Sequence, residues 1–174
     1  AQEAYIQAHM GHFEEALFGP TFFNVQGIRY NTYTDITSFV DFLLINEFSK
    51  NSDGYKLSSY LHKDKDSKGG KFVMGPIWDF DQTCGLSTVC SSDDHTGWTY
   101  LQNQNDCEDL ESMPMWWQSF MSDTLFTNHL ACRWEDMRQG PLHLDSINAW
   151  IDNQRSNMQA GIDRNFVKWQ FLGS

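Results

Sequence analysis

Three acidic residues near the middle of the chain have the chemistry of a divalent cation site. Asp53 stands in the polar segment 49–54, directly after an apolar stretch, and Asp79 and Asp81 belong to a Trp-Asp-Phe-Asp motif. Hard cations such as Mg²⁺ prefer carboxylate oxygens, and Mg²⁺ commonly binds one or two carboxylates together with the phosphates of a substrate. The three acids therefore predict a cation site with room for a phosphate group, provided that the fold brings them together.

A β-hairpin predicted between these acids would supply that arrangement. Residues 59–63 and 71–74 alternate in polarity, and a charged turn that ends in two glycines joins them. Because a hairpin returns the chain to the place where it began, we expect Asp53 before the hairpin and Asp79 after it to lie close together.

Apolar residues recur at helical spacing on both sides of the hairpin. The predicted helices are residues 1–17, residues 36–48 behind an Asp35 N-cap, residues from Met115 to a break at Gly140-Pro141, and residues from an Asp145 cap to Phe166. Four tryptophans on these helices are predicted to lie in the core: Trp116, Trp117, Trp134 and Trp150. Residues 83–112, rich in Ser, Asp, Asn and Gly, predict a long loop or insertion. This order of elements predicts one mostly helical α+β domain over residues 1–174.

The composition argues against two classes of partner. Of the 174 residues, 40% are hydrophobic, which is enough to build a packed core. The net charge of −11 argues against a nucleic-acid partner, because a phosphate backbone is bound by a basic surface. No segment reaches the ~18 apolar residues of a membrane-spanning helix, and residues 1–8 lack the pattern of a signal peptide.

The cysteines bear on the compartment in which the protein works. None of them fits a zinc-binding spacing, and they allow disulfide bonds only if the protein is exported. The sequence favours at least one disulfide bond among them: Cys84, Cys90, Cys107 and Cys132.

Several motifs in order along the chain resemble those of the CotH family of atypical protein kinases. The segments are DITSFVDFLLINEFSKNSDGY, SSYLHKD and GPIWDFDQTCG, followed by a helical tail that contains RWEDMR and IDNQRSNMQAGIDRNFVKW. The resemblance implies a kinase-like C-terminal lobe with a small β-hairpin. It also implies phosphoryl transfer from ATP to Ser or Thr of a protein substrate, with Mg²⁺ or Mn²⁺ as cofactor. A secreted, periplasmic or cell-surface location is implied as well.

The resemblance assigns a role to each acid of the central region. Asp53 matches the catalytic-loop aspartate, which orients the substrate hydroxyl and accepts its proton. Asp79 matches the metal-binding aspartate, and Asp81 matches a second metal ligand. Glu47, at the end of the second predicted helix, either positions the loop or joins the metal shell.

The chain departs from the family pattern in two ways. Ser58 and Ser59 stand where many members carry an asparagine that assists the metal, and a hydroxyl is a poorer ligand than an amide carbonyl. No glycine-rich phosphate loop or nucleotide-binding lysine is found, so the nucleotide lobe is expected to be absent from this segment and the segment alone to be inactive. Two alternatives stay open: a non-catalytic secreted or cell-surface binding module with a kinase-like fold, and a calcium-stabilised adhesion domain.

Overall fold

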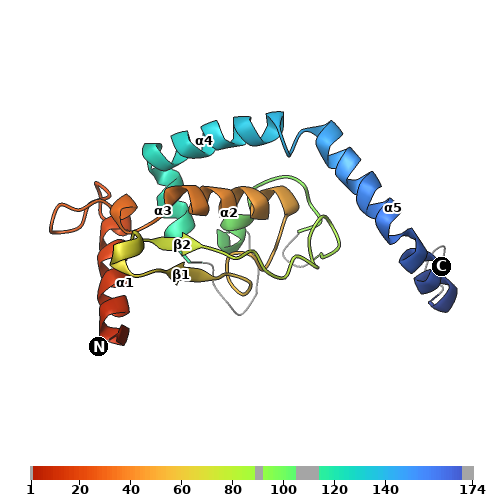
Figure 1. The fold of residues 1–174 in the computed structure, drawn as a ribbon. Coiled ribbons are helices and arrows are strands. Elements are labelled where there is room, and N and C mark those ends of the chain that lie inside the picture. Colours follow the sequence, from red (N-terminus) through yellow and green to blue (C-terminus); the bar gives the residue numbers. More distant parts are fainter. Residues whose placement is uncertain (1, 89–91, 105–113, 170–174) are drawn as a thin grey trace. The chain divides into compact units, whose positions relative to one another are not determined.

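The structure is a computed structural model that describes residues 2–88, 92–104 and 114–169 (Figure 1). The chain packs as two compact units, Ala1–Ala131 and Cys132–Ser174, and each is described by itself. Most of the described residues are helical, and two short strands form one antiparallel sheet. The predicted mostly helical α+β class with a small β-hairpin is therefore confirmed.

The first unit holds the hairpin and the helices that pack around it (Figure 1). Helix α2 packs against strand β2, and helix α1 packs against helix α3. Short 3₁₀ segments lie in three of the connections. The helices and strands are α1 (Gln2–Phe18), α2 (Ile36–Ser49), β1 (Leu61–Lys63), β2 (Phe72–Met74), α3 (Trp116–Ser122) and the start of α4 (Thr124–Gln139); the 3₁₀ segments are η1 (Tyr30–Thr32), η2 (Asp66–Lys68) and η4 (Thr99–Gln104).

Aromatic side chains build the core of this unit. Phe120 of α3 lies at its centre, with its ring centroid 5.2 Å from Phe39 of α2 and 4.8 Å from Phe126 of α4. Trp117 is buried beside Phe120, and Trp116 packs against the cluster and donates its indole N–H to Glu14. The helices of the unit are thus fixed to one another by ring packing, which buries a large apolar area per residue.

Helix α2 begins at a cap that is visible in the sequence and ends at a residue in the left-handed conformation. The Asp35 side chain accepts a hydrogen bond from the backbone N–H of Ser38 at 3.1 Å, as the N-cap prediction requires. Lys50 ends the helix in the left-handed conformation, with φ 54° and ψ 49°. The hairpin pairs Leu61 with Met74 and Lys63 with Phe72. Its strands therefore begin later than the predicted segments 59–63 and 71–74, at residues 61 and 72.

The second unit contains the end of α4 and the long helix α5 (Leu144–Lys168), separated at the predicted break. The N-cap of α5 is His143, whose Nδ1 accepts the N–H of Asp145 at 3.3 Å, so the prediction of Asp145 as the cap was wrong. Trp134 and Trp150 are exposed rather than buried, which corrects their assignment to the core. No helix in the described part of the chain is long and apolar enough to cross a membrane.

The structure describes part of segment 83–112 and two of the four cysteines. The described part of the segment contains the 3₁₀ segment η4, so the predicted loop is locally ordered there. Cys84 and Cys132 are exposed free thiols. The other two cysteines lie outside the described residues, and the prediction of a disulfide bond there stays a prediction.

Candidate functional site

The loop that follows α2 is folded back onto the end of that helix and carries Asp53. The N–H of Asn51 donates to the carbonyl of Asn46 in the last turn, at 3.1 Å. The Lys50 ammonium donates to the carbonyls of Thr96 and Gly97, at 2.8 and 2.7 Å. The chain that leaves α2 is therefore tied to the helix on one side and to the segment before η4 on the other.

The main chain of Asp53 is bonded on both sides. Its N–H donates to Oδ1 of Asn51 at 3.3 Å, which forms a turn closed by a side chain. Its carbonyl accepts the N–H groups of Lys56, Leu57 and Ser58 at 3.2, 3.0 and 2.9 Å. The side chain of Asp53 is half-buried. The backbone position of the predicted catalytic acid is thus set by four hydrogen bonds within its own loop.

Asp79 and Asp81 lie on the segment that leaves β2, and both side chains are exposed. Asp79 has φ 61°, in the left-handed region that aspartate enters more readily than most residues. Farther along, the N–H of Cys84 donates to the carbonyl of Ser49, the last residue of α2, at 2.7 Å. This bond brings the Trp-Asp-Phe-Asp segment back to the helix end from which the Asp53 loop departs.

A second contact holds this segment against the start of the hairpin. The Trp78 and Tyr60 rings meet edge to face with centroids 6.3 Å apart. The N–H of Gly75 donates to the carbonyl of Tyr60 at 2.9 Å. The segment that carries Asp79 is therefore held at Tyr60 and, through Cys84, at the C-terminal end of α2, while the proximity of the Asp53 and Asp79 carboxylates stays a prediction.

The described residues include no group of three or more His, Cys, Asp and Glu side chains placed to hold a metal ion. A magnesium site that is completed by substrate phosphates needs only one or two carboxylates. The assignment of Asp79 and Asp81 as metal ligands therefore stays a prediction.

Glu47 joins three parts of the site through its carboxylate. Oε1 accepts the hydroxyl of Tyr55 at 2.8 Å and the N–H of Tyr100 at 2.9 Å, while Oε2 accepts the N–H of Thr99 at 2.7 Å. Burial, and then the negative charge of Glu47, raise the pKa values of the Tyr55 and Tyr100 hydroxyls. Of the two roles that the sequence allowed, these contacts are those of a residue that positions the loop.

The two serines at the expected asparagine position belong to the internal bonding of the loop. Ser58 is buried, and its N–H is one of the donors to the Asp53 carbonyl. The Ser59 hydroxyl donates to the carbonyl of Gly54 at 2.6 Å. As placed, the Ser59 hydroxyl closes the loop.

Sequence reasoning did not single out Asn46, Asn51 and Tyr55, all of which are fully or almost fully buried at this site. The available signal was one amide, Asn46, in the last turn of a largely apolar helix and a second, Asn51, just after the helix ends. Their importance follows from contacts within the loop, which apolar periodicity does not report.

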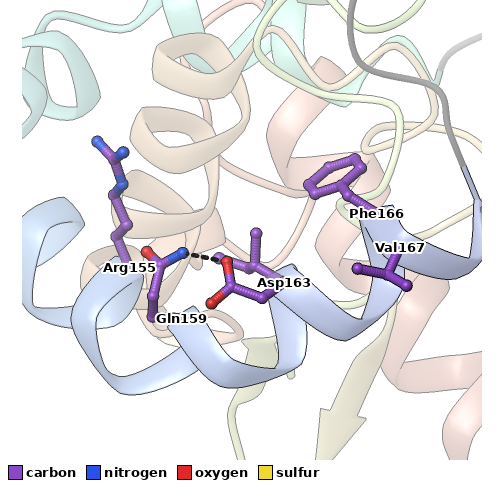
Figure 2. A pocket seen from close by; sticks show the side chains of 6 residues that line it. Arg155, Gln159, Asp163, Phe166 and Val167 are labelled. Atoms are coloured by element: carbon purple, nitrogen blue, oxygen red, sulfur yellow. Dashed lines mark hydrogen bonds between the residues drawn. The ribbon is translucent and has the colours of Figure 1, made fainter.

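A separate hollow lies in the second unit, along α5 (Figure 2). Within it the Gln159 amide donates to Asp163 at 2.7 Å. Its lining comes from one face of one helix: Arg155, Gln159, Ile162, Asp163, Phe166 and Val167. None of the acids predicted to bind metal or accept a proton lines it.

Comparison with known proteins adds one finding. No curated protein and no solved structure matched the chain. The family model described as CotH kinase protein matches residues 4–174. This range includes α2 with the Asp53 loop, the hairpin and the Trp-Asp-Phe-Asp segment. The chain therefore belongs to the CotH kinase family.

Proposed function

We propose that this chain carries the metal-binding and proton-accepting residues of a kinase that transfers a phosphoryl group from ATP to Ser or Thr of a protein substrate. In this proposal the first unit is part of a kinase-like C-terminal lobe. The observation that carries the proposal is the joining of two acid-bearing segments at one helix end. The Asn51 N–H bonds to Asn46 and the Cys84 N–H bonds to Ser49, so the loop of Asp53 and the chain that follows Asp79 and Asp81 are both tied to the last turn of α2.

Each acid has a defined part in the proposed reaction. The oxygen of the substrate hydroxyl forms a bond to the γ-phosphorus while the bond from that phosphorus to ADP breaks. The hydroxyl proton passes to the Asp53 carboxylate. Asp79 and Asp81 offer exposed, oxygen-only ligands, a donor set that fits Mg²⁺ or Mn²⁺. When bound, such a cation would neutralise negative charge on the nucleotide phosphates.

The location is proposed from the family resemblance as secreted, periplasmic or cell-surface. A second candidate function is a non-catalytic binding module with the same fold. The observation that favours it is the hydrogen bond from the Ser59 hydroxyl to Gly54, which engages a side chain at the position where an asparagine would assist the metal.

Phosphoryl transfer decides between the two functions. The protein, expressed from its native reading frame, is incubated with γ-labelled ATP, Mn²⁺ and a mixture of Ser- and Thr-containing peptides. We expect label on the peptides with the wild type and none with Asp53→Asn or Asp79→Asn. Asp64→Asn, which changes an exposed acid in the hairpin turn, serves as the matched control and should transfer normally. Wild-type protein that binds neither metal nor nucleotide would favour the binding module.

A further inference from the structure

Two side-chain amides are buried beneath the loop that carries Asp53. Asn46 and Asn51 are both 0% exposed. Oδ1 of Asn46 and Nδ2 of Asn51 have no hydrogen-bond partner within 2–88, 92–104 and 114–169. A buried polar atom without a partner costs about 1–3 kcal/mol. Such atoms persist in a fold only where other contacts hold their side chains in place.

Both amides approach the same point of the loop, the position that a β-carbon on Gly54 would occupy. That position overlaps Oδ1 of Asn46 and lies 3.1 Å from Nδ2 of Asn51. Gly54 is not among the glycines with positive φ, so the need for glycine here is steric rather than conformational. One α-hydrogen of Gly54 therefore points at Oδ1 of Asn46, as in a weak Cα–H···O contact.

The Asn46 amide is held and cannot turn away from a larger residue without loss. Its Nδ2 donates to the carbonyl of Phe42 at 2.8 Å, one turn earlier in α2. On the other side of Gly54, Oδ1 of Asn51 accepts the N–H of Asp53. A chain of contacts thus runs from the helix through the two amides and Gly54 to the main chain of Asp53.

We propose that Asn46 and Asn51 are positioning residues that act through Gly54 and the Asp53 main chain to aim the Asp53 carboxylate at the substrate hydroxyl. This inference rests on the proposed function, because it takes Asp53 as the proton acceptor. The amides touch neither ATP nor substrate in this scheme. They set the direction from which the carboxylate is presented, and misplacement by about 1 Å is enough to slow an enzyme about a hundredfold.

The test compares Gly54→Ala and Asn51→Ala with two matched variants. Gly11→Ala replaces a glycine of α1 that also lacks positive φ and has nothing within 4 Å of its β-carbon position. Asn51→Ser keeps a side-chain oxygen that can accept the Asp53 N–H. Phosphoryl transfer by the protein expressed from its native reading frame gives kcat and KM for ATP, and hydrogen exchange measured by NMR follows the Asp53 amide.

For Gly54→Ala and Asn51→Ala we expect kcat to fall about a hundredfold, with KM for ATP changed less than about threefold. The Asp53 amide should exchange faster in Asn51→Ala, and both kcat and protection should recover in part in Asn51→Ser. Gly11→Ala should match the wild type. Should Gly54→Ala not fold, the two Asn51 variants carry the test.

Two results would overturn the inference. One is an unchanged kcat in Gly54→Ala and Asn51→Ala. The other is an equal loss in Gly11→Ala, which would indicate general destabilisation. A wild type without transfer activity would overturn the proposed function instead. The Asp53 amide then decides the positioning, since equal exchange in Asn51→Ala and the wild type would refute it.

Discussion

Glu47→Ala removes the carboxylate that joins α2, the Asp53 loop and η4, and its cost can be estimated from the contacts. The N–H groups of Thr99 and Tyr100 lose their acceptor, and both residues are less than 10% exposed. The Tyr55 hydroxyl retains a bond to the carbonyl of Leu43 at 3.2 Å. At about 1–3 kcal/mol for each stranded buried donor, the loss is about 3 kcal/mol after allowance for partial solvation.

Thermal unfolding measures this loss directly. For a chain of this size, about 1 kcal/mol lowers Tm by about 2–4 °C, so we expect Glu47→Ala to lower it by about 6–12 °C. Glu15→Ala, which removes an exposed glutamate of α1, is the control and should stay within about 0.5 kcal/mol of the wild type. A loss below about 1 kcal/mol for Glu47→Ala would refute the claim that this carboxylate holds the loop.

Glu47→Gln separates the loop-positioning role from a role in the metal shell. The amide keeps one oxygen acceptor but places an NH₂ group against one of the backbone donors, so we expect about half of the stability loss of Glu47→Ala. Mn²⁺ affinity, measured by calorimetry, should be unchanged. A variant with normal stability that no longer binds Mn²⁺ would show instead that Glu47 is a metal ligand.

Three further results are expected. A hundredfold excess of Mn²⁺ over its Kd should stabilise the wild type by about 2.7 kcal/mol, and melting curves should show that Asp79→Asn loses this increment with its fold intact. Burial, and then the nearby Lys63 charge, lower the pKa of His9 in the folded state, so stability should fall as the pH drops below about 6.5. His9→Phe should flatten that part of a urea-unfolding profile. Asp123 is 2% exposed and accepts hydrogen bonds from Arg29 and Tyr30, so Asp123→Ala should cost about 3–5 kcal/mol in the same assay.

The elements around the site were predictable because their signals are local. The Asp35 cap lies three residues from the N–H that it accepts, and the hairpin alternates in polarity over short strands. These patterns predict α2 and the hairpin that separates the Asp53 segment from the Asp79 segment. The identity of the α5 cap was missed, because Asp is a preferred N-cap residue and His is not, whereas the backbone geometry places His143 at the cap.

The contacts that hold the site were not predictable from local patterns. Glu47 accepts hydrogen bonds from backbone groups 52 and 53 residues away, at the start of η4. The reason for glycine at position 54 lies in the Asn46 side chain rather than in a turn conformation. Apolar residues at helical spacing predict an apolar face but not which element packs against it. For this reason Trp150 was assigned to the core, although it is exposed.

The end of α2 at which the acid-bearing segments meet has a consequence for the order in which ligands would arrive. Aligned peptide dipoles give the C-terminal end of a helix about half a negative charge. At α2 this partial charge lies at the turn from which the acidic Asp53 loop departs and to which the chain after Asp79 and Asp81 is tied. Free ATP, which is strongly anionic, would meet a repulsive field there, whereas a cation would be attracted. In the proposed function, the nucleotide therefore reaches this helix end as its metal complex or after the metal.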